Sequence, residues 1–439
     1  MFKKLLESNK HHIRSLTKEG LWILAGQAAT VIGSLVLVRV LTEMVSPLEY
    51  GKLALGLTIA GLVTQVLTGG IISGIGRFYS IAIEKSDLKG YLNSSVQLMI
   101  FAYIGVAILA CLVVIGLLVT HQQEWIFLTL LVLLYSIFSG ANSTLNGIQN
   151  AARQRSIVAI HTGIDSWLKI GLALAFIYAI GNTSMSVVMG YTLSSLIIVV
   201  SQFIFLKKFV DKMGLSFSKN IENWKLKIWH YSWPMMAGGI FNWGYFSSQR
   251  WALEMYASTH EVGKFYALSQ IAYAPISMAG SMFMSFIIPI LYEKTGDPSN
   301  NNKISKVHRM VLYISGLGLA VTSIVALISW AFHDLIFQLF VAKEYHNISP
   351  LMPLVILSSG ILIVSQTLAT TISAKNETKR FLPLAIFGNG FVTLLNFIMT
   401  WKAGVNGLVY SMVIGSIIHL IWMVLIVRSS EKERGERGA

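Results

Sequence analysis

The sequence predicts an all-α polytopic membrane protein, with about 12 transmembrane helices in two six-helix lobes. Composition is the first reason, because 54% of the 439 residues are hydrophobic and 12% are charged, whereas a soluble domain carries about 25% charged residues. The second reason is that apolar runs of about 20 residues, the length needed to cross a bilayer, recur along the chain. The third is an internal repeat, in which residues 46–55 resemble residues 258–267.

The apolar runs divide the chain into two halves of similar organisation. The N-terminal lobe, residues 1–206, has predicted spans at 20–41, 51–73, 94–119, 125–147, 157–180 and 186–206. A polar stretch at 207–228 is the predicted cytoplasmic linker. The C-terminal lobe, residues 229–439, has predicted spans at 229–250, 263–289, 309–331, 350–372, 381–401 and 405–427, followed by a short cytoplasmic tail.

The distribution of basic residues predicts the orientation of these spans. Most of the 34 Lys and Arg residues lie in alternate connecting segments, on the side that also holds both termini. Because basic residues beside spans stay in the cytoplasm, we expect the N- and C-termini to be cytoplasmic. This asymmetry accounts for most of the net charge of +14, so no nucleic-acid partner is expected.

Nothing in the sequence indicates a cofactor, a metal site or catalytic residues. The single cysteine, Cys111, excludes an internal disulfide and a CxxC metal or redox site. No GxxxxGK[ST] phosphate loop is present, so we do not expect the chain to hydrolyse ATP. The connectors on the external side are also too short to fold as a catalytic domain, so we expect a protein that is not an enzyme.

The internal repeat matches at four of its positions. Ser46, Glu49, Gly51 and Lys52 correspond to the Ser, Glu, Gly and Lys of the segment 258–264. Each copy is the turn between the first and second spans of its half. Because each half has an even number of spans, the halves would be related by a pseudo-twofold axis along the membrane normal, which is common in transporters that work by alternating access.

Two further features concern helix packing. Gly70 and Gly74 form a GxxxG pattern, which permits a close contact with another helix. Pro275 lies within a predicted span and removes a backbone hydrogen bond, so we expect a kink or a flexible point there.

Several segments together resemble a known family. They are Glu49-Tyr50-Gly51, Gly69-Gly70 to Arg77-Phe78-Tyr79, Trp233-Pro234 to Arg250, Glu261 to Tyr266, and Pro289. In these the chain resembles the Wzx-type flippases of O-antigen and other oligosaccharides, in the polysaccharide synthesis and transport family. That family belongs to the multidrug/oligosaccharidyl-lipid/polysaccharide exporter (MOP) superfamily, whose fold is MATE-like.

The resemblance implies a multi-pass protein of the bacterial inner membrane. Its implied substrate is an undecaprenyl-pyrophosphate-linked oligosaccharide, moved from the cytoplasmic to the periplasmic leaflet for O-antigen or capsular polysaccharide synthesis, and hence for lipopolysaccharide. Its implied partners are membrane lipids and other membrane proteins of polysaccharide assembly. The chain departs from related drug/cation antiporters, because its first span lacks Asp and Glu, and Ser247-Ser248-Gln249-Arg250 replaces an Asp before Arg.

Three cations within spans are candidate ligands for the pyrophosphate. Arg39 and Arg250 lie near the ends of equivalent spans, and two guanidinium groups facing one cleft would suit pyrophosphate oxygens. Alternatively, each extends to the outer headgroups. Lys169 is the deepest cation, and Asp165 shares its helix face four residues earlier. This pair either fixes packing or exchanges partners when the anionic substrate arrives.

Other polar residues within spans complete the candidate set. Asp165, Glu254 and His161 are candidates for ion coupling or charge pairing. Asn242 and Gln249 could bind sugar hydroxyls, although hydrogen bonds between helices would also explain them.

Two other functions stay open at this point. An ion-coupled drug or cation exporter of the same fold is one of them. The other is a membrane glycosyltransferase or ligase, which would need a site on an external loop; the residues available there are Glu43, Glu49, His333, Asp334 and His346.

Overall fold

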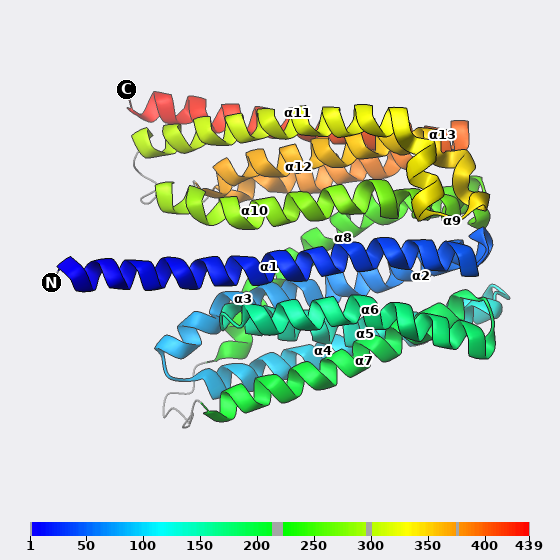
Figure 1. The fold of residues 1–439 in the computed structure, drawn as a ribbon, viewed down its shortest axis with the longest axis horizontal. Helices are drawn as coiled ribbons and strands as arrows, with labels where there is room; N and C mark the ends of the chain where they lie inside the picture. The colour runs from blue at the N-terminus through cyan, green and yellow to red at the C-terminus, as the bar shows by residue number, and fades with distance from the viewer. Residues whose placement is uncertain (1, 213–222, 296–300, 375–376, 439) are drawn as a thin grey trace. The chain divides into compact units, whose positions relative to one another are not determined.

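The computed structural model describes residues 2–212, 223–295, 301–374 and 377–438 (Figure 1). Within these ranges the chain is helical, with short turns and no strand. Nine helices in the described part are long and apolar enough to cross a membrane. The fold is therefore that of an all-α, multi-pass membrane protein, as predicted.

The chain forms two compact units. Unit 1 comprises residues 1–37 and 56–240, and unit 2 comprises residues 38–55 and 241–439. The end of the first helix and the start of the second thus group with the C-terminal half. The division predicted at residues 206 and 229 stays a prediction.

The helices of the first half run in the expected order. Their bounds are α1 (Phe2–Met44), α2 (Pro47–Leu62), the π-helical turn η1 (Val63–Thr68), α3 (Gly69–Glu84), α4 (Leu88–Val119), α5 (Glu124–Ala151), α6 (Arg155–Ile180) and α7 (Ser184–Lys212). The predicted span at 51–73 is thus part of a longer helical segment, Pro47–Glu84, which is apolar enough to cross a membrane.

The second half contains more interruptions. Its elements are α8 (Trp224–Tyr256), α9 (Thr259–Leu268), η2 (Ser269–Tyr273), α10 (Ala274–Thr295), α11 (Asn301–Phe340), η3 (Lys343–Leu351), α12 (Met352–Ala374), η4 (Thr378–Phe381), η5 (Leu384–Gly388) and α13 (Asn389–Gly438). Helix α13 includes non-helical backbone at Ala403 and Gly404, where Gly404 has a φ of 54° that favours glycine. This break falls between the predicted spans 381–401 and 405–427.

A π-helical turn interrupts the second span of each half. Turn η1 lies between α2 and α3, and turn η2 lies between α9 and α10, directly before Pro275. The kink or flexible point expected at Pro275 stays a prediction, because η2 ends at Tyr273 and the equivalent turn η1 contains no proline. A π-helical turn leaves the regular hydrogen-bond ladder and often lies at a functional site.

The core of unit 1 joins α3 and α4 to the start of α8. Tyr91 donates from its hydroxyl to Ile75 O at 2.6 Å, and the indole Nε1 of buried Trp224 donates to Asp87 Oδ2 at 2.7 Å. A Cβ at Gly70 would lie 2.7 Å from Ser232 O. One at Gly74 would lie 3.1 Å from Ile228 O. The GxxxG prediction is confirmed, since these glycines let α3 and α8 approach closely.

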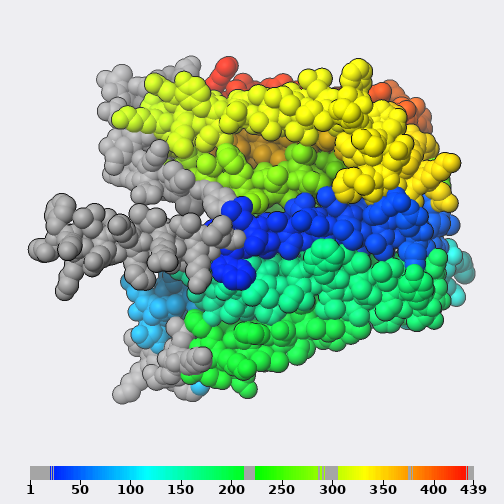
Figure 2. All heavy atoms as spheres, viewed as in Figure 1, coloured from blue at the N-terminus to red at the C-terminus, as the bar shows by residue number. Residues whose placement is uncertain are grey.

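The surface of unit 2 suits contact with lipid. Helix α11 lies on this surface along most of its length (Figure 2), and its exposed face carries Leu317, Ile324, Leu327 and Trp330. Inside the unit, Ser248 Oγ accepts from Asn396 Nδ2 at 2.8 Å, and Ser411 Oγ donates to Asn396 Oδ1 at 2.6 Å. These buried polar groups are thus paired, while apolar groups face outward, the reverse of a soluble protein.

Candidate functional site

The two copies of the repeated motif contact each other in unit 2. A Cβ at Gly51 would overlap Thr259 O, and a Cβ at Gly263 would overlap Pro47 O. Residues 47 and 259 hold the same place in the two copies, as do 51 and 263. The contact is therefore reciprocal, which is the signature of a local twofold axis.

The remaining matches of the repeat have equivalent roles in both copies. Ser46 Oγ accepts from Glu49 N at 3.4 Å, and Ser258 Oγ accepts from Glu261 N at 3.3 Å, so each serine caps the helix that follows. Lys52 pairs with Glu49 at 2.8 Å, and Lys264 pairs with Glu261 at 3.0 Å. All four residue matches therefore have a structural reason.

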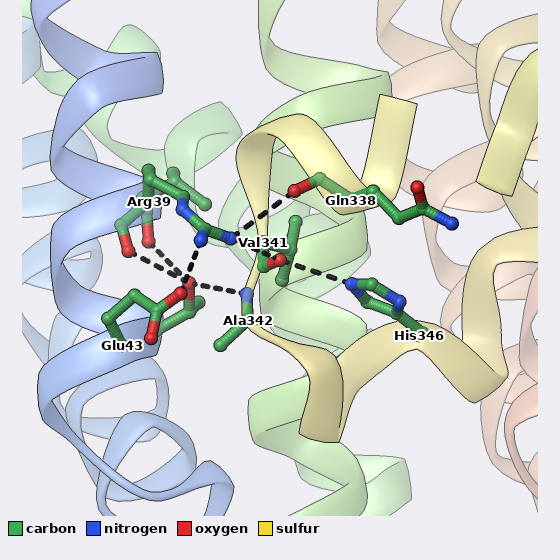
Figure 3. A network of polar contacts seen from close by, with 8 residues as sticks. Arg39, Glu43, Gln338, Val341, Ala342 and His346 are labelled. Atoms are coloured by element: carbon green, nitrogen blue, oxygen red, sulfur yellow. Dashed lines mark hydrogen bonds and ion pairs between the residues drawn. The ribbon is translucent and has the colours of Figure 1, made fainter. Parts of the chain in front are cut away.

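Arg39 binds the end of α11 (Figure 3). Its Nη1 donates to Val341 O at 2.6 Å and to Gln338 O at 3.5 Å, while Nη2 forms an ion pair with Glu43. The last carbonyls of a helix lack partners within the helix and carry partial negative charge, so a guanidinium is a favourable cap. Close by, Ala342 N donates to Thr42 Oγ1 at 3.1 Å.

Arg250 binds the start of the second span. Its Nη1 donates to Ala54 O at 3.1 Å, and its guanidinium carbon lies 4.7 Å from the centroid of the Tyr266 ring. The Tyr266 ring also contacts Tyr50 at a centroid distance of 5.0 Å. The two predicted arginines thus both lie in unit 2, Arg250 on a carbonyl of α2 and Arg39 on the carbonyl of Val341, the residue directly after α11. Whether they face one cleft stays a prediction.

Glu254 and Gln249 lie on the same helix as Arg250. Glu254 Oε1 accepts from Thr259 Oγ1 at 2.8 Å, and its other oxygen is buried without a hydrogen-bond partner. The helix spacing predicts a pair with Arg250, but the arginine's contacts are with Ala54 and Tyr266 instead. Gln249 is buried, with 8% of its surface exposed.

The predicted charge pair of unit 1 forms as expected. Lys169 Nζ lies 2.6 Å from Asp165 Oδ2, and Ser194 Oγ donates to Asp165 Oδ1 at 2.8 Å. Lys169 Nζ also lies 5.7 Å from the Tyr135 centroid and 5.9 Å from that of Tyr191. About a fifth of each charged side chain is exposed, 19% for Lys169 and 20% for Asp165.

His161 lies on the same helix but makes contacts of its own. Its Nδ1 lies 2.8 Å from Ile157 O, and its Nε2 lies 3.0 Å from Ser201 Oγ. Since a carbonyl only accepts, Nδ1 carries a hydrogen and Nε2 is free to accept from the serine. The contact with Ser201 links α6 to α7. Neither of these two contacts of His161 involves Asp165. Its part in ion coupling stays a prediction.

Unit 2 also holds a pocket of about 220 Å³, of which the sequence analysis singled out only Asn242. Its polar lining residues come from three helices and are Asn242, Tyr245, Ser365, Gln366, Asn389 and His419. Aromatic walls come from Phe246 and Phe381. Polar residues inside predicted spans were the available signal, but Gln366, Asn389 and His419 are distant in sequence from Asn242, so their meeting could not be foreseen.

One known protein family matches most of this chain. The model of the family described as "Polysaccharide biosynthesis protein" matches residues 16–294, well over half of the chain. The chain belongs to this family. No curated protein matches it.

Solved structures of the MOP superfamily share its fold. A Vibrio cholerae MATE transporter, VcmN, matches with a TM-score of 0.61 and 16% identity over 96% of this chain and 97% of that one. The lipid II flippase MurJ, in an inward closed conformation, matches with a TM-score of 0.68 and 14% identity over 93% of this chain and 87% of that one. At these identities the matches show the fold alone, which this chain shares with MATE transporters and with the lipid II flippase.

Proposed function

We propose that this protein is a flippase that moves an undecaprenyl-pyrophosphate-linked oligosaccharide from the cytoplasmic to the periplasmic leaflet of a bacterial inner membrane. The observation that carries the proposal is membership of a polysaccharide biosynthesis family by a chain with the fold of MOP transporters. A polysaccharide precursor made in the cytoplasm on a lipid carrier must cross the bilayer before assembly outside. The product would serve O-antigen or capsular polysaccharide synthesis, with other assembly proteins of the membrane as partners.

Lys169 is the residue we propose for binding the pyrophosphate. It is partly exposed, and its partner Asp165 keeps a second hydrogen bond from Ser194, so the carboxylate would stay satisfied when the ammonium moves to a substrate oxygen. Charge-assisted hydrogen bonds of this kind are roughly twice as strong as neutral ones. Lys169 could exchange the Asp165 carboxylate for the substrate pyrophosphate and back again, and so bind and release the substrate in each transport cycle.

The contact between the repeated motifs supports a role in alternating access. It lies on the side predicted to be external, and it consists of helix starts that meet at Gly51 and Gly263, with Arg250 bound to Ala54 O beside them. Opening toward that side would require these helix starts to separate. We therefore propose that the contact stabilises the outwardly closed state.

Of the external-loop residues named for the enzyme alternative, His333 and Asp334 both contact Ser349, and the geometry there argues against a nucleophilic serine. Ser349 Oγ donates its single hydrogen to Asp334 Oδ1 at 2.9 Å, so His333 Nδ1, at 3.0 Å, must donate to the serine rather than accept from it. Ser349 is also only 1% exposed. A nucleophilic serine needs an accessible hydroxyl beside a general base, and the burial of Ser349 leaves the first condition unmet.

Translocation in reconstituted liposomes tests the proposed function. Fluorescent undecaprenyl-pyrophosphate oligosaccharide is incorporated, and the fraction accessible to a membrane-impermeant quencher is followed in liposomes with protein and without it. Faster exchange between leaflets with protein supports the flippase. The second candidate, an exporter of cationic drugs, is favoured by the MATE fold; drug uptake without lipid movement would establish it instead.

A further inference from the structure

We infer that the pocket of unit 2 binds one sugar ring of the transported glycan; this inference rests on the proposed function and names the part of the substrate that is recognised there. The pocket lies among α8, α12, η4, η5 and α13, all within unit 2. Its lining combines amides, a histidine and aromatic rings with apolar side chains, among them Leu362, Leu384 and Met423. The character of that lining identifies the ligand.

The pocket carries no formal charge on its lining. Its polar groups are the side chains of Asn242, Gln366 and Asn389, together with His419, Ser365 and Tyr245, and no Asp, Glu, Lys or Arg is among the described residues that line it. A pyrophosphate would need cations, and a cationic drug would favour carboxylates or more extensive aromatic faces. Neutral amides that both donate and accept match the hydroxyl groups of a sugar.

Aromatic rings supply the second requirement of a sugar site. Tyr245 and Phe246 meet edge to face with centroids 4.8 Å apart, and Phe381 lines the pocket from η4. A pyranose ring presents C–H groups on its faces, and these carry the weak positive charge that the face of an aromatic ring attracts. The lining therefore offers contacts for both the hydroxyl edge and the apolar face of a sugar.

His419 supplies an unsatisfied group. Its Nε2 is buried and has no hydrogen-bond partner, although its ring contacts Tyr245 with centroids 5.4 Å apart. A buried polar atom without a partner costs free energy, and it is rare in folded proteins. His419 lines the pocket, so a rotation of its ring would let a sugar hydroxyl pair with this nitrogen and remove that cost.

The wall of the pocket is built from irregular helix. Leu384 and Ala385 belong to the π-helical turn η5, and Asn389 follows it directly. The pocket residue Phe246 also contacts Tyr273 of the other π-helical turn, η2, at a centroid distance of 6.1 Å. Turns of this kind are frequent at functional sites, where they change the direction of side chains.

The size of the pocket limits the ligand to one ring. Its volume is about 220 Å³. Pockets for drug-sized ligands measure about 300 to 1,000 Å³. One sugar fits, and the rest of an oligosaccharide would extend outside.

Binding of two lipids by the purified full-length protein in detergent tests the inference. One lipid is undecaprenyl pyrophosphate, and the other is undecaprenyl pyrophosphate linked to an oligosaccharide. The wild type should bind the glycosylated lipid more tightly. Gln366→Leu and His419→Leu should each reduce that preference roughly 2- to 10-fold, the effect of about one lost hydrogen bond, without weakening binding of the bare lipid.

Matched variants separate recognition from folding. Gln338→Leu makes the same change on α11, where the exposed side chain lies outside the pocket, and it should keep the preference. His419→Gln retains a hydrogen-bonding group and should restore part of the preference lost in His419→Leu. All variants are first required to elute as the wild type does in size exclusion and to melt within a few degrees of it.

Each other outcome overturns the inference. Equal affinity of the wild type for both lipids would remove the sugar site while leaving the flippase standing, since the lipid is still bound. A preference that persists in both folded leucine variants would place sugar recognition elsewhere. Failure of the wild type to bind either lipid would overturn the proposed function and this inference together.

Discussion

The cations of the two units are held in different ways. In unit 2, Arg250 donates to a backbone carbonyl of α2, and Arg39 donates to the carbonyl of Val341 directly after α11 in addition to its ion pair with Glu43; the backbone acceptors are fixed by the fold. In unit 1, Lys169 is held by the side chain of Asp165, which can rotate and which has a second partner in Ser194. All three cations have an acidic residue four positions away in sequence, but only the side chain of Lys169 is free to exchange its present acceptor for a ligand. The arginine contacts at the repeat suit a structural role, and the lysine contact suits an exchangeable one.

The largest effect should come from the glycines at the repeat contact. Gly263→Ala places a Cβ where Pro47 O already lies, so α2 and α9 must separate. We expect a loss of about 1 to 3 kcal/mol in unfolding free energy, the usual cost of overpacking, and strongly reduced translocation. Thermal unfolding in detergent and the liposome assay measure both.

Gly316→Ala is the matched control for this substitution. Nothing lies within 4 Å of a Cβ at Gly316 on α11. Replacing a helical glycine there should be neutral or stabilise by up to about 1 kcal/mol. Equal effects of the two substitutions would show that the repeat contact is not close-packed.

The second effect concerns the lysine of unit 1. Lys169→Met removes a charge-assisted hydrogen bond and should cost about 1.5 to 3 kcal/mol in stability. It should also abolish most translocation if Lys169 binds the pyrophosphate. Thermal unfolding and flipping rate are measured on the same preparation.

A double variant decides between packing and transport at this pair. Asp165→Asn with Lys169→Met leaves no unpaired charge and should recover much of the stability. Translocation should stay low, because the ligand for the anion is still missing. Recovery of transport together with stability would mean that the pair only fixes packing.

The ion pair of Asp165 and Lys169 and the positions of the helices were predictable from patterns between residues close in sequence. Apolar runs indicated the spans, and the four-residue spacing of Asp165 and Lys169 put both on one helix face. The pocket of unit 2 was not predictable beyond α8, which contributes Asn242 and Tyr245, because Ser365, Gln366, Asn389 and His419 come from distant segments and meet this helix only through packing. Arg39 was predictable as a cation near a span end, but its acceptors were not, since they lie at the far end of α11.

A smaller difference is expected between the two arginines themselves. Arg250 combines a carbonyl contact with a face-on contact to Tyr266, whereas 39% of the Arg39 side chain is exposed. A cation over an aromatic ring contributes about 0.5 to 2 kcal/mol, more when water is excluded. Arg250→Met should therefore lower the melting temperature further than Arg39→Met. The opposite order would show that the cap on α11 is the stronger contact.

The smallest effects should come from the two equivalent ion pairs. Glu49→Gln and Glu261→Gln each remove one pair three residues apart on a helix. Such pairs contribute about 0.2 to 0.5 kcal/mol, so both variants should melt within a degree or two of the wild type. A much larger loss at only one of them would show that the two copies of the motif are not equivalent in energy.

The reciprocal contact of Gly51 and Gly263 also constrains the lengths of two distant turns. One turn, residues 45–46, joins α1 to α2, and the other, residues 257–258, joins α8 to α9. Each helix residue corresponds to a rotation of about 100°, so inserting one residue into either turn would rotate the start of the helix that follows. Because each glycine packs on a carbonyl of the other copy, that rotation would displace both contacts at once. Neither turn is therefore free to vary in length by itself.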